Sequence, residues 1–163
     1  MNDFIMEDGY MFYSTLRNEF VQKQNGKSLL QYTGTQNEIV VPEVKQLNVK
    51  CFFDNQYIKK VQLPNGLVNI HNKAFMRCEN LETIDIPRSV EEIGDKAFWG
   101  CSSLKTVIIR SHNVAIGTSC FDWCTSLETM YFASPATFNK AREQLLMAAA
   151  HGLIPRDVKI KYL

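Results

Sequence analysis

The amino-acid sequence predicts an α/β repeat solenoid, with a parallel β-sheet on one face of the stack and short helical turns on the other. Three observations support this prediction. Apolar residues recur every 23 positions, the strand pattern of the first three repeats ends in proline, and both ends of the chain depart from the repeat. A period of 20–29 residues is typical of solenoids, because a single coil is too thin to bury its own apolar face.

The period is carried by several columns of similar residues in one frame. The matched positions are Val61, Ile84, Val107 and Met130; Phe52, Phe75, Phe98 and Phe121; Cys78, Cys101 and Cys124; Leu81, Leu104 and Leu127; and Leu47, Ile70, Ile93 and Ile116. The clearest copy runs from Leu81 to Ser103. We expect these columns to form the interior of about four coils over residues 39–133, stacked about 4.8 Å apart.

Each repeat reads L-x-x-I-x-I-P-x-x-V-x-x-I-G-x-x-A-F-x-x-C. Its first part alternates in polarity and is rich in β-branched residues, so it predicts a strand. Pro64 and Pro87 end that strand, because proline has no N–H to donate to the sheet. The short A-F-x-x-C segment predicts a helical or 3₁₀ turn.

Two coils depart from the repeat. The first is one residue short between Pro42 and Val44, and it has Cys51 in place of alanine and Asn55 in place of cysteine. In the fourth, Arg110 replaces proline and Asn113 falls at the position of Val90. We expect Val114 to take the buried position through a local shift, which makes this turn irregular.

Terminal coils need caps, because each would otherwise expose an apolar face. Residues 1–38 predict a hairpin-rich cap, since Asp8-Gly9 and Asn25-Gly26 are strong hairpin turns. A short helix over Thr15–Lys23 is the alternative.

Residues 134–163 predict a helix followed by a strand. Ser134-Pro135 is a helix start and Gly152 is a stop signal. The expected apolar face comprises Phe138, Ala141, Leu145, Leu146 and Ala149. After Pro155, residues 158–162 predict a last strand that closes the sheet.

The copies Ile70–Cys78, Ile93–Cys101 and Ile116–Cys124 resemble the BspA-type leucine-rich repeat. The resemblance covers residues 39–133, and residues 27–42 are similar to the segment that often precedes such repeats. It implies a leucine-rich-repeat stack. It also implies a relation to bacterial and protozoan proteins that are usually secreted or on the cell surface and bind other proteins.

The charge balance argues against a partner that is attracted electrostatically. Lys plus Arg number 18 and Asp plus Glu number 17, so the formal net charge is +1. Such a chain has no overall field to attract nucleic acid or an anionic membrane, and no apolar run approaches the ~20 residues of a membrane span. The N-terminus is acidic where a signal peptide is basic. We therefore expect a cytoplasmic protein, or a cell-surface or secreted one if a leader was removed.

The residues that could carry chemistry all have structural explanations. The five cysteines lie at repeat positions, Cys51 and Cys120 in the alanine column, and are expected to be small buried thiols. Disulfides between neighbouring coils are geometrically conceivable, but the odd count favours a reducing compartment. His71 replaces the turn glycine of the next repeats. We expect no catalytic residue, no metal, no cofactor and no enzymatic activity.

One candidate binding surface lies on the strands. Three columns point outward: Lys59, Glu82, Lys105 and Glu128; Lys60, Thr83, Thr106 and Thr129; and Gln62, Asp85, Ile108 and Tyr131. The first column alternates in sign and predicts a ladder of ion pairs. In the third, Ile108 and Tyr131 lie beside Arg110, a composition typical of binding hot spots. The alternatives are that they are ordinary exposed apolar residues or that the C-terminal helix covers them.

A second candidate surface follows the repeat phenylalanine. It comprises Phe53, Met76, Trp99 and Trp123, which would form a continuous apolar patch on adjacent coils. The alternative is that the turn folds them against Phe75 and Phe98 as an outer layer of the core.

Together these features predict a non-enzymatic protein–protein interaction module of the leucine-rich-repeat class, whose partner is another protein. Two alternatives remain open at this stage. One is a small stand-alone inhibitor or decoy, encoded by a phage or pathogen, that blocks a host protein. The other is an adhesive structural repeat fragment of a surface protein.

Overall fold

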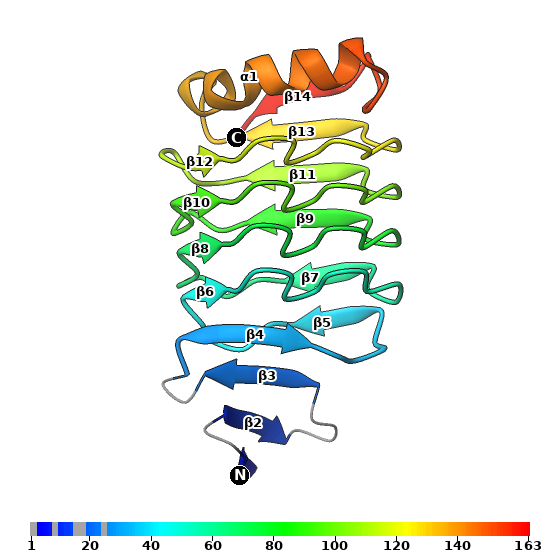
Figure 1. Ribbon diagram of the computed structural model, residues 1–163. Coiled ribbons are helices and arrows are strands. Elements are labelled where there is room, and N and C mark those ends of the chain that lie inside the picture. Colours follow the sequence, from blue (N-terminus) through cyan, green and yellow to red (C-terminus); the bar gives the residue numbers. More distant parts are fainter. Residues whose placement is uncertain (1–2, 8–9, 15–18, 24–25) are drawn as a thin grey trace.

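A computed structural model of the chain describes residues 3–7, 10–14, 19–23 and 26–163. The described chain is a solenoid whose coils lie one above the other from the N-terminal to the C-terminal end (Figure 1). Each full coil contributes a long strand, a two-residue strand and a turn segment. The prediction of a repeat solenoid with parallel sheets is therefore confirmed.

The long strands form a six-stranded sheet in the order β14-β13-β11-β9-β7-β5. Their bounds are β5 (Glu38–Val40), β7 (Lys60–Gln62), β9 (Thr83–Ile86), β11 (Thr106–Ile109), β13 (Thr129–Phe132) and β14 (Lys159–Tyr162). In this parallel sheet Val107 pairs with Ile84 on one side and Met130 on the other, which confirms the frame of 23 residues. Ile39 pairs with Val61, so the residue missing from the first coil is absorbed after its strand.

The second sheet has eight strands, in the order β1-β2-β3-β4-β6-β8-β10-β12. Its bounds are β1 (Asp3–Glu7), β2 (Tyr10–Ser14), β3 (Phe20–Lys23), β4 (Ser28–Tyr32), β6 (Gln46–Leu47), β8 (Asn69–Ile70), β10 (Glu92–Ile93) and β12 (Ala115–Ile116). The first four strands pair antiparallel, as expected for a hairpin-rich cap. The alternative helix over 15–23 is wrong for residues 20–23, which form β3; residues 8–9, 15–18 and 24–25 lie outside the described residues.

The core is a set of stacked columns that includes all four repeat phenylalanines. Phe52, Phe75, Phe98 and Phe121 are each at most 3% exposed. Neighbouring rings stack with centroids 4.6, 5.2 and 5.6 Å apart and planes within 7° of parallel. Tyr32 of β4 continues the column, with its centroid 5.5 Å from that of Phe52. The cap thus joins the core through an aromatic contact.

The irregular fourth coil follows the predicted local shift. Val114 is fully buried, whereas Asn113 is exposed. The register recovers at once, because Ile116 of β12 pairs with Ile93 of β10. The hydroxyl of Thr137 donates to the carbonyl of Ser111 at 3.4 Å and ties this turn to the C-terminal helix.

The turn side of each coil is built from overlapping hydrogen-bonded turns, not from the short helical or 3₁₀ turn that we predicted. In the third coil the N–H groups of Trp99 and Cys101 donate to carbonyls three residues earlier, both at 3.2 Å. A continuous helix cannot form, because Lys96 and Gly100 have positive φ angles of 55° and 74°.

Positive φ angles recur along the turn side in two columns. The columns are Lys50, Lys73, Lys96 and Ser119, and Asp54, Arg77, Gly100 and Trp123. On this side, each of the first three coils donates three N–H groups to three carbonyls of the coil that follows it. These hydrogen bonds are 2.7–3.2 Å long and stack in three columns. The turn side is thus held by a ladder of its own.

The C-terminal cap is α1 (Pro135–Ala150) followed by β14. Ser134 caps the helix, its side chain accepting from the N–H of Thr137, and Gly152 ends it with a φ of +70°. The prediction of a helix and a closing strand is confirmed, but one face residue is wrong. Leu146 is 60% exposed, since it lies about 140° around the helix from the buried Ala141. Among the residues described, no helix combines the length and apolarity needed to cross a membrane.

The predicted ladder of ion pairs along Lys59, Glu82, Lys105 and Glu128 is wrong. Their backbones do stack, with the N–H of Glu82 donating to Lys59 and that of Lys105 to Glu82. None of the ion pairs found among the described residues joins two of these side chains. Exposed charges in water gain little from pairing, so strand spacing is not enough to hold them together.

Candidate protein-interaction surface

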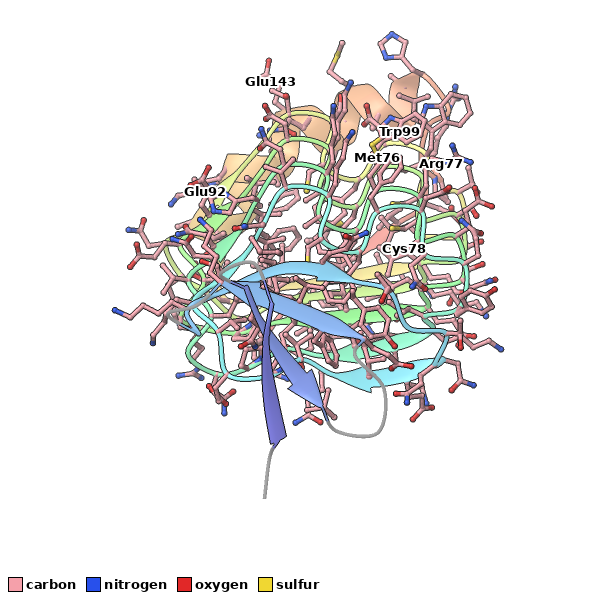
Figure 2. All side chains as sticks on the ribbon, turned by 60° about the horizontal axis from the view of Figure 1, so that its bottom comes forward. Met76, Arg77, Cys78, Glu92, Trp99 and Glu143 are labelled. Atoms are coloured by element: carbon pink, nitrogen blue, oxygen red, sulfur yellow. The ribbon has the colours of Figure 1, made fainter. Side chains whose placement is uncertain are left out.

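The turn patch, which we define as Phe53, Met76, Trp99 and Trp123, runs along successive coils of the turn side. Figure 2 shows Met76 and Trp99 on the same side of the solenoid, with Arg77 close to them. Phe53 is 38% and Trp123 49% exposed, whereas Met76 and Trp99 are half-buried. The patch is therefore neither fully folded against the core nor a set of isolated side chains.

Trp123 is the distinctive member of this patch. Its ring meets that of Trp99 edge-on, with centroids 6.4 Å apart. Its φ of +64° lies in the left-handed region, where a bulky residue is a genuine outlier and costs of order 1–2 kcal/mol. The equivalent residues of the other coils, Asp54, Arg77 and Gly100, are also left-handed, so the conformation belongs to the repeat and only the tryptophan is particular to this coil. The conformation turns the indole outward, where half of it meets solvent.

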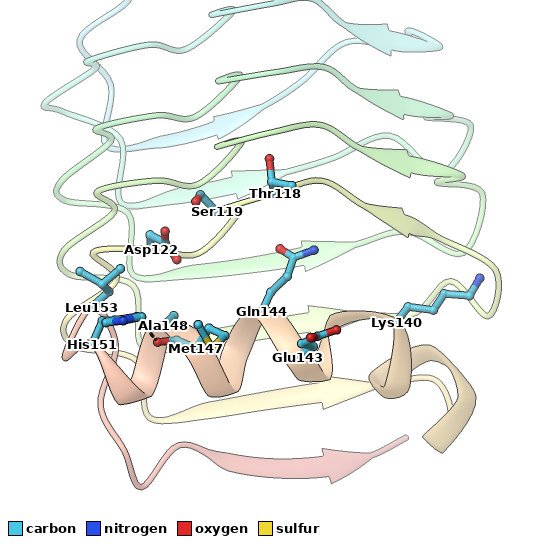
Figure 3. A pocket seen from close by; sticks show the side chains of 10 residues that line it. All are labelled: Thr118, Ser119, Asp122, Lys140, Glu143, Gln144, Met147, Ala148, His151 and Leu153. Atoms are coloured by element: carbon cyan, nitrogen blue, oxygen red, sulfur yellow. Dashed lines mark hydrogen bonds between the residues drawn. The ribbon is translucent and has the colours of Figure 1, made fainter.

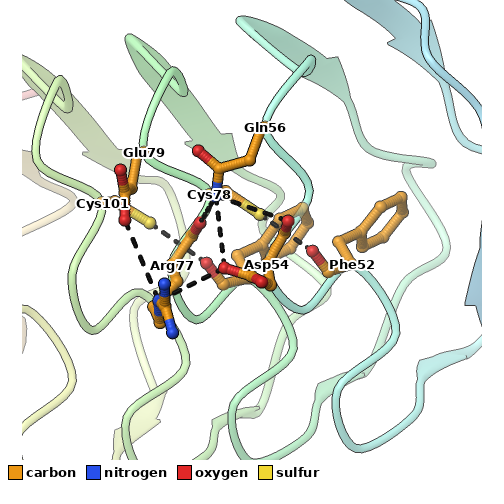
Figure 4. Close-up of polar contacts among 8 residues, drawn as sticks. Phe52, Asp54, Gln56, Arg77, Cys78, Glu79 and Cys101 are labelled. Carbon is orange, nitrogen blue, oxygen red and sulfur yellow. Dashed lines mark hydrogen bonds and ion pairs between the residues drawn. The ribbon is translucent and has the colours of Figure 1, made fainter.

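A polar cluster, shown in Figure 4, includes Asp54 and Arg77, which directly follow Phe53 and Met76 of the turn patch in the sequence. The guanidinium Nε of Arg77 lies 3.2 Å from the Asp54 carboxylate and 3.9 Å from that of Glu79. The Gln56 side chain donates to the carbonyl of Arg77 at 2.9 Å. At the other end, Lys50 Nζ lies 5.2 Å from the centroid of Phe53. Apolar rings beside satisfied polar groups resemble the core and rim of a protein interface.

The strand patch, defined as Ile108, Arg110 and Tyr131, lies on the outer face of the six-stranded sheet. Ile108 and Tyr131 pair across β11 and β13, and both are half-buried. Arg110 is already engaged by Asp85, with Nε–Oδ1 and Nη2–Oδ2 distances of 2.7 and 2.8 Å. This bidentate bond raises the pKa of Arg110.

The apolar part of the strand patch is also partly covered. Lys161 Nζ of β14 lies 5.5 Å from the centroid of the Tyr131 ring. A partner docking there would have to displace this cation and compete with Asp85 for Arg110. The C-terminal strand, rather than the helix as we had considered, provides this cover.

The cysteines form a buried ladder, as predicted. All five thiols are free and buried. The thiols of Cys78, Cys101 and Cys124 donate to the carbonyls of Phe52, Phe75 and Phe98 at 3.0, 3.2 and 3.3 Å. In the first coil Asn55 takes the cysteine position, and its amide donates to the carbonyl of Gly34 at 3.0 Å.

Burial decides the chemistry of these thiols. It raises the pKa of Cys78 and of Cys120 to about 12, and it also raises that of Cys51, Cys101 and Cys124. A protonated, inaccessible thiol is a poor nucleophile and a poor metal ligand. Within the described part of the chain, no group of three His, Cys, Asp or Glu side chains is placed to hold a metal ion.

Sequence reasoning missed two features of the turn side. Tyr57, next to the polar cluster in sequence, is 55% exposed. The two left-handed columns were also missed, because only Gly100 is a residue that signals positive φ. Lysine, arginine and tryptophan carry no such signal.

Parallel coils with stacked apolar columns and hydrogen-bonded turns define this protein as a leucine-rich-repeat solenoid. The family model described as "BspA type Leucine rich repeat region (6 copies)" matches residues 23–145. The chain belongs to this family, as its repeats indicated. The comparison with curated proteins finds no match.

Several solved structures of bacterial proteins have the same fold. A leucine-rich cell surface protein from Faecalibacterium prausnitzii is 21% identical with a TM-score of 0.65, and the match covers 98% of this chain and 39% of that one. A leucine-rich-repeat protein from Bacteroides capillosus is 20% identical with a TM-score of 0.61, over 80% of this chain and 99% of that one. The pneumococcal vaccine antigen PcpA is 20% identical with a TM-score of 0.59, over 99% and 48%. The chain thus spans less than half the length of two of these proteins.

Proposed function

We propose that this chain is a non-enzymatic interaction module that binds another protein through the turn patch. The observation that carries the proposal is Trp123, half exposed in a left-handed conformation and in edge contact with Trp99. Tryptophan is the residue type most typical of binding hot spots, and an exposed indole in contact with a second one offers an apolar anchor for a partner. The flanking Phe53 and Met76 extend the apolar surface along the coils.

The strand patch is the second candidate. Ile108 and Tyr131 lie side by side on a regular sheet, which favours it as a flat docking surface. Against it, Arg110 is paired with Asp85 and Tyr131 is partly covered by Lys161. A charge that is already satisfied gains little on binding, because its bond must first be broken.

Two matched double variants decide between the patches. The chain is immobilised and used to capture its partner from the native host, with the captured protein identified by mass. We expect the Trp99→Ser plus Trp123→Ser variant to lose more than about 2 kcal/mol of binding free energy, the size of a hot-spot effect, and so to capture little partner. The Ile108→Ser plus Tyr131→Ser variant should retain it. The opposite result, with both variants folded by circular dichroism, would move the site to the strand patch.

The compartment is also part of the proposal. We propose that the chain works in the cytoplasm with reduced thiols, which its five free, buried cysteines support. A role as a decoy of a host protein is compatible with this location. The alternative, a fragment of a surface protein, is supported by the name of the Faecalibacterium protein. Fractionation of native cells, with the chain detected by antibody, separates the two.

A further inference from the structure

The hydrogen-bond ladder of the turn side has a direction, and its last row of donors is open. Every coil donates N–H groups to the carbonyls of the following coil. In the third coil the donors are Lys96, Phe98 and Gly100, with distances of 3.0, 3.0 and 2.9 Å. The equivalent donors of the last coil are Ser119, Phe121 and Trp123. None of these three N–H groups has an acceptor among the described residues.

The inner coils show what these donors bind. The acceptors are carbonyls of alternate residues: Asn72, Ala74 and Met76 in the second coil, Asp95, Ala97 and Trp99 in the third, and Thr118, Cys120 and Asp122 in the fourth. The central residue is small each time and is at most 1% exposed. A row of three N–H groups in this geometry therefore fits a turn segment of about five residues, like those of the inner coils, with a small central residue.

The C-terminal helix leaves room beside this edge. α1 packs against β12 and β13, and a hollow of about 430 Å³ separates it from the last turn (Figure 3). Thr118, Ser119 and Asp122 line the hollow from the turn, and Gln144 and Met147 line it from the helix. The cap thus covers the core of the last coil without pairing with its donor row.

We propose that this open edge, defined as the N–H groups of Ser119, Phe121 and Trp123, binds a turn segment of a partner protein, shaped like the turns of the inner coils, through three of its carbonyls. The backbone of such a segment would supply the hydrogen bonds, as the backbone of each inner coil does for the coil before it. The partner segment needs a small central residue, because that position faces the core.

Complementarity of donors and acceptors selects this occupant over two others. A second copy cannot pair through the same edge, because each edge presents donors only. An anion would suit a row of N–H groups, but two carboxylates, those of Asp122 and Glu143, line the hollow against one lysine. That lysine, Lys140, already donates to Asn113. The inference assumes a protein partner, as the proposed function does, but it does not require the side chains of the turn patch.

The test uses a segment of this chain as the probe. A blocked peptide with the sequence of residues 94–100, Gly-Asp-Lys-Ala-Phe-Trp-Gly, is added to the folded protein, and amide hydrogen exchange is followed by NMR. In the free protein the three edge amides should exchange about 100-fold faster than those of Lys96, Phe98 and Gly100. At about 1 mM peptide their exchange should slow about tenfold. A control peptide with the Ala97→Leu change should have no such effect.

Three outcomes overturn the inference. The edge amides could be as protected in the free protein as the inner ones, the peptide could leave them unprotected, or inorganic phosphate could protect them equally, which would make the edge an anion site. The Trp99→Ser plus Trp123→Ser variant keeps the three N–H groups, so peptide protection should persist in it. If the tryptophan variant loses partner capture but the peptide still protects its edge amides, both proposals are supported. If the peptide fails to protect the edge amides of the unaltered chain, only the open-edge proposal is rejected.

Discussion

The rings of Phe75 and Phe98 stack with their centroids 5.2 Å apart and their planes 7° from parallel. Both side chains are fully buried, and each belongs to a different coil. The contact therefore connects residues that are 23 positions apart, and its repetition along the stack makes neighbouring coils depend on each other.

Replacing the ring in the middle of this column should disrupt most of the domain. We expect Phe98→Ala to lower the free energy of unfolding by about 3–5 kcal/mol, because the rings above and below cannot close the cavity. The measurement is the denaturant midpoint. An unchanged midpoint would show that the phenylalanine column is not interior in solution.

Glycine and alanine substitutions should rank oppositely in stability at Trp123 and at Trp99, because, of the two, only Trp123 has a positive φ angle. At Trp123, glycine should be more stable than alanine by about 1 kcal/mol, because φ is positive there. At Trp99, where φ is not positive, alanine should be more stable than glycine by about 0.5–1 kcal/mol. Thermal unfolding of the four variants measures both differences. Alanine favoured at both sites would contradict the left-handed conformation.

Stability should fall at alkaline pH, because unfolding exposes the buried thiols and allows them to ionise. The pKa of Cys78 is raised from 9.0 to about 12 by burial. Below pH 9 the thiol is protonated in both the folded and the unfolded state, so its contribution to the free energy of unfolding does not change with pH. Between pH 9 and 12 only the unfolded chain releases the proton, and stability decreases. The decrease should be smaller for Cys78→Ala than for the unaltered chain, and equal slopes would exclude this thiol as a cause.

The same burial should make the thiols slow to react. In the native protein we expect rapid labelling by a thiol reagent to stay below about one label per molecule, because the thiolate is the reactive form. After unfolding, all five cysteines should be labelled. A colorimetric thiol titration with and without denaturant measures this. Rapid labelling of the whole set, or a mass deficit from disulfides, would refute the buried, reduced state.

The ion pair between Arg110 and Asp85 should be real but weak. Nearly half of each side chain is exposed, so a double-mutant cycle with Asp85→Ala and Arg110→Ala should give a small stabilising coupling. The coupling should shrink in about 1 M salt, which screens charges over a few ångströms. If no coupling is found, Arg110 is available to a partner and the strand patch becomes the stronger candidate.

Much of the architecture could be predicted because the repeat constrains it heavily. Matched residues such as Ile84, Val107 and Met130 had to share one column, and they are fully buried in adjacent strands. The cap helix was predicted by Ser134-Pro135 and Gly152, whose conformational preferences are local. Even the shift to Val114 was predictable, because only an apolar residue can occupy a core column.

The candidate site was less predictable, because it depends on which partner each side chain finds. From the sequence, Arg110 looked like a free anchor and Lys59 and Glu82 like an ion pair. In the folded chain Arg110 is bound by Asp85, and Lys59 and Glu82 do not pair with each other. Strand order brings such charges within reach, but rotamers and solvent decide which contacts form.

The amino-acid sequence by itself determined the coil length, the buried columns and the two caps, because these follow from a repeated pattern of apolar residues. Only the tertiary structure decided the conformation of the turns and the end of their ladder. Left-handed residues such as Lys73 and Arg77 have no sequence signature, since their φ angles go with hydrogen bonds to the neighbouring coil. The open donor row at Ser119, Phe121 and Trp123 likewise becomes visible only when the coils are stacked and α1, instead of a further coil, follows the fourth.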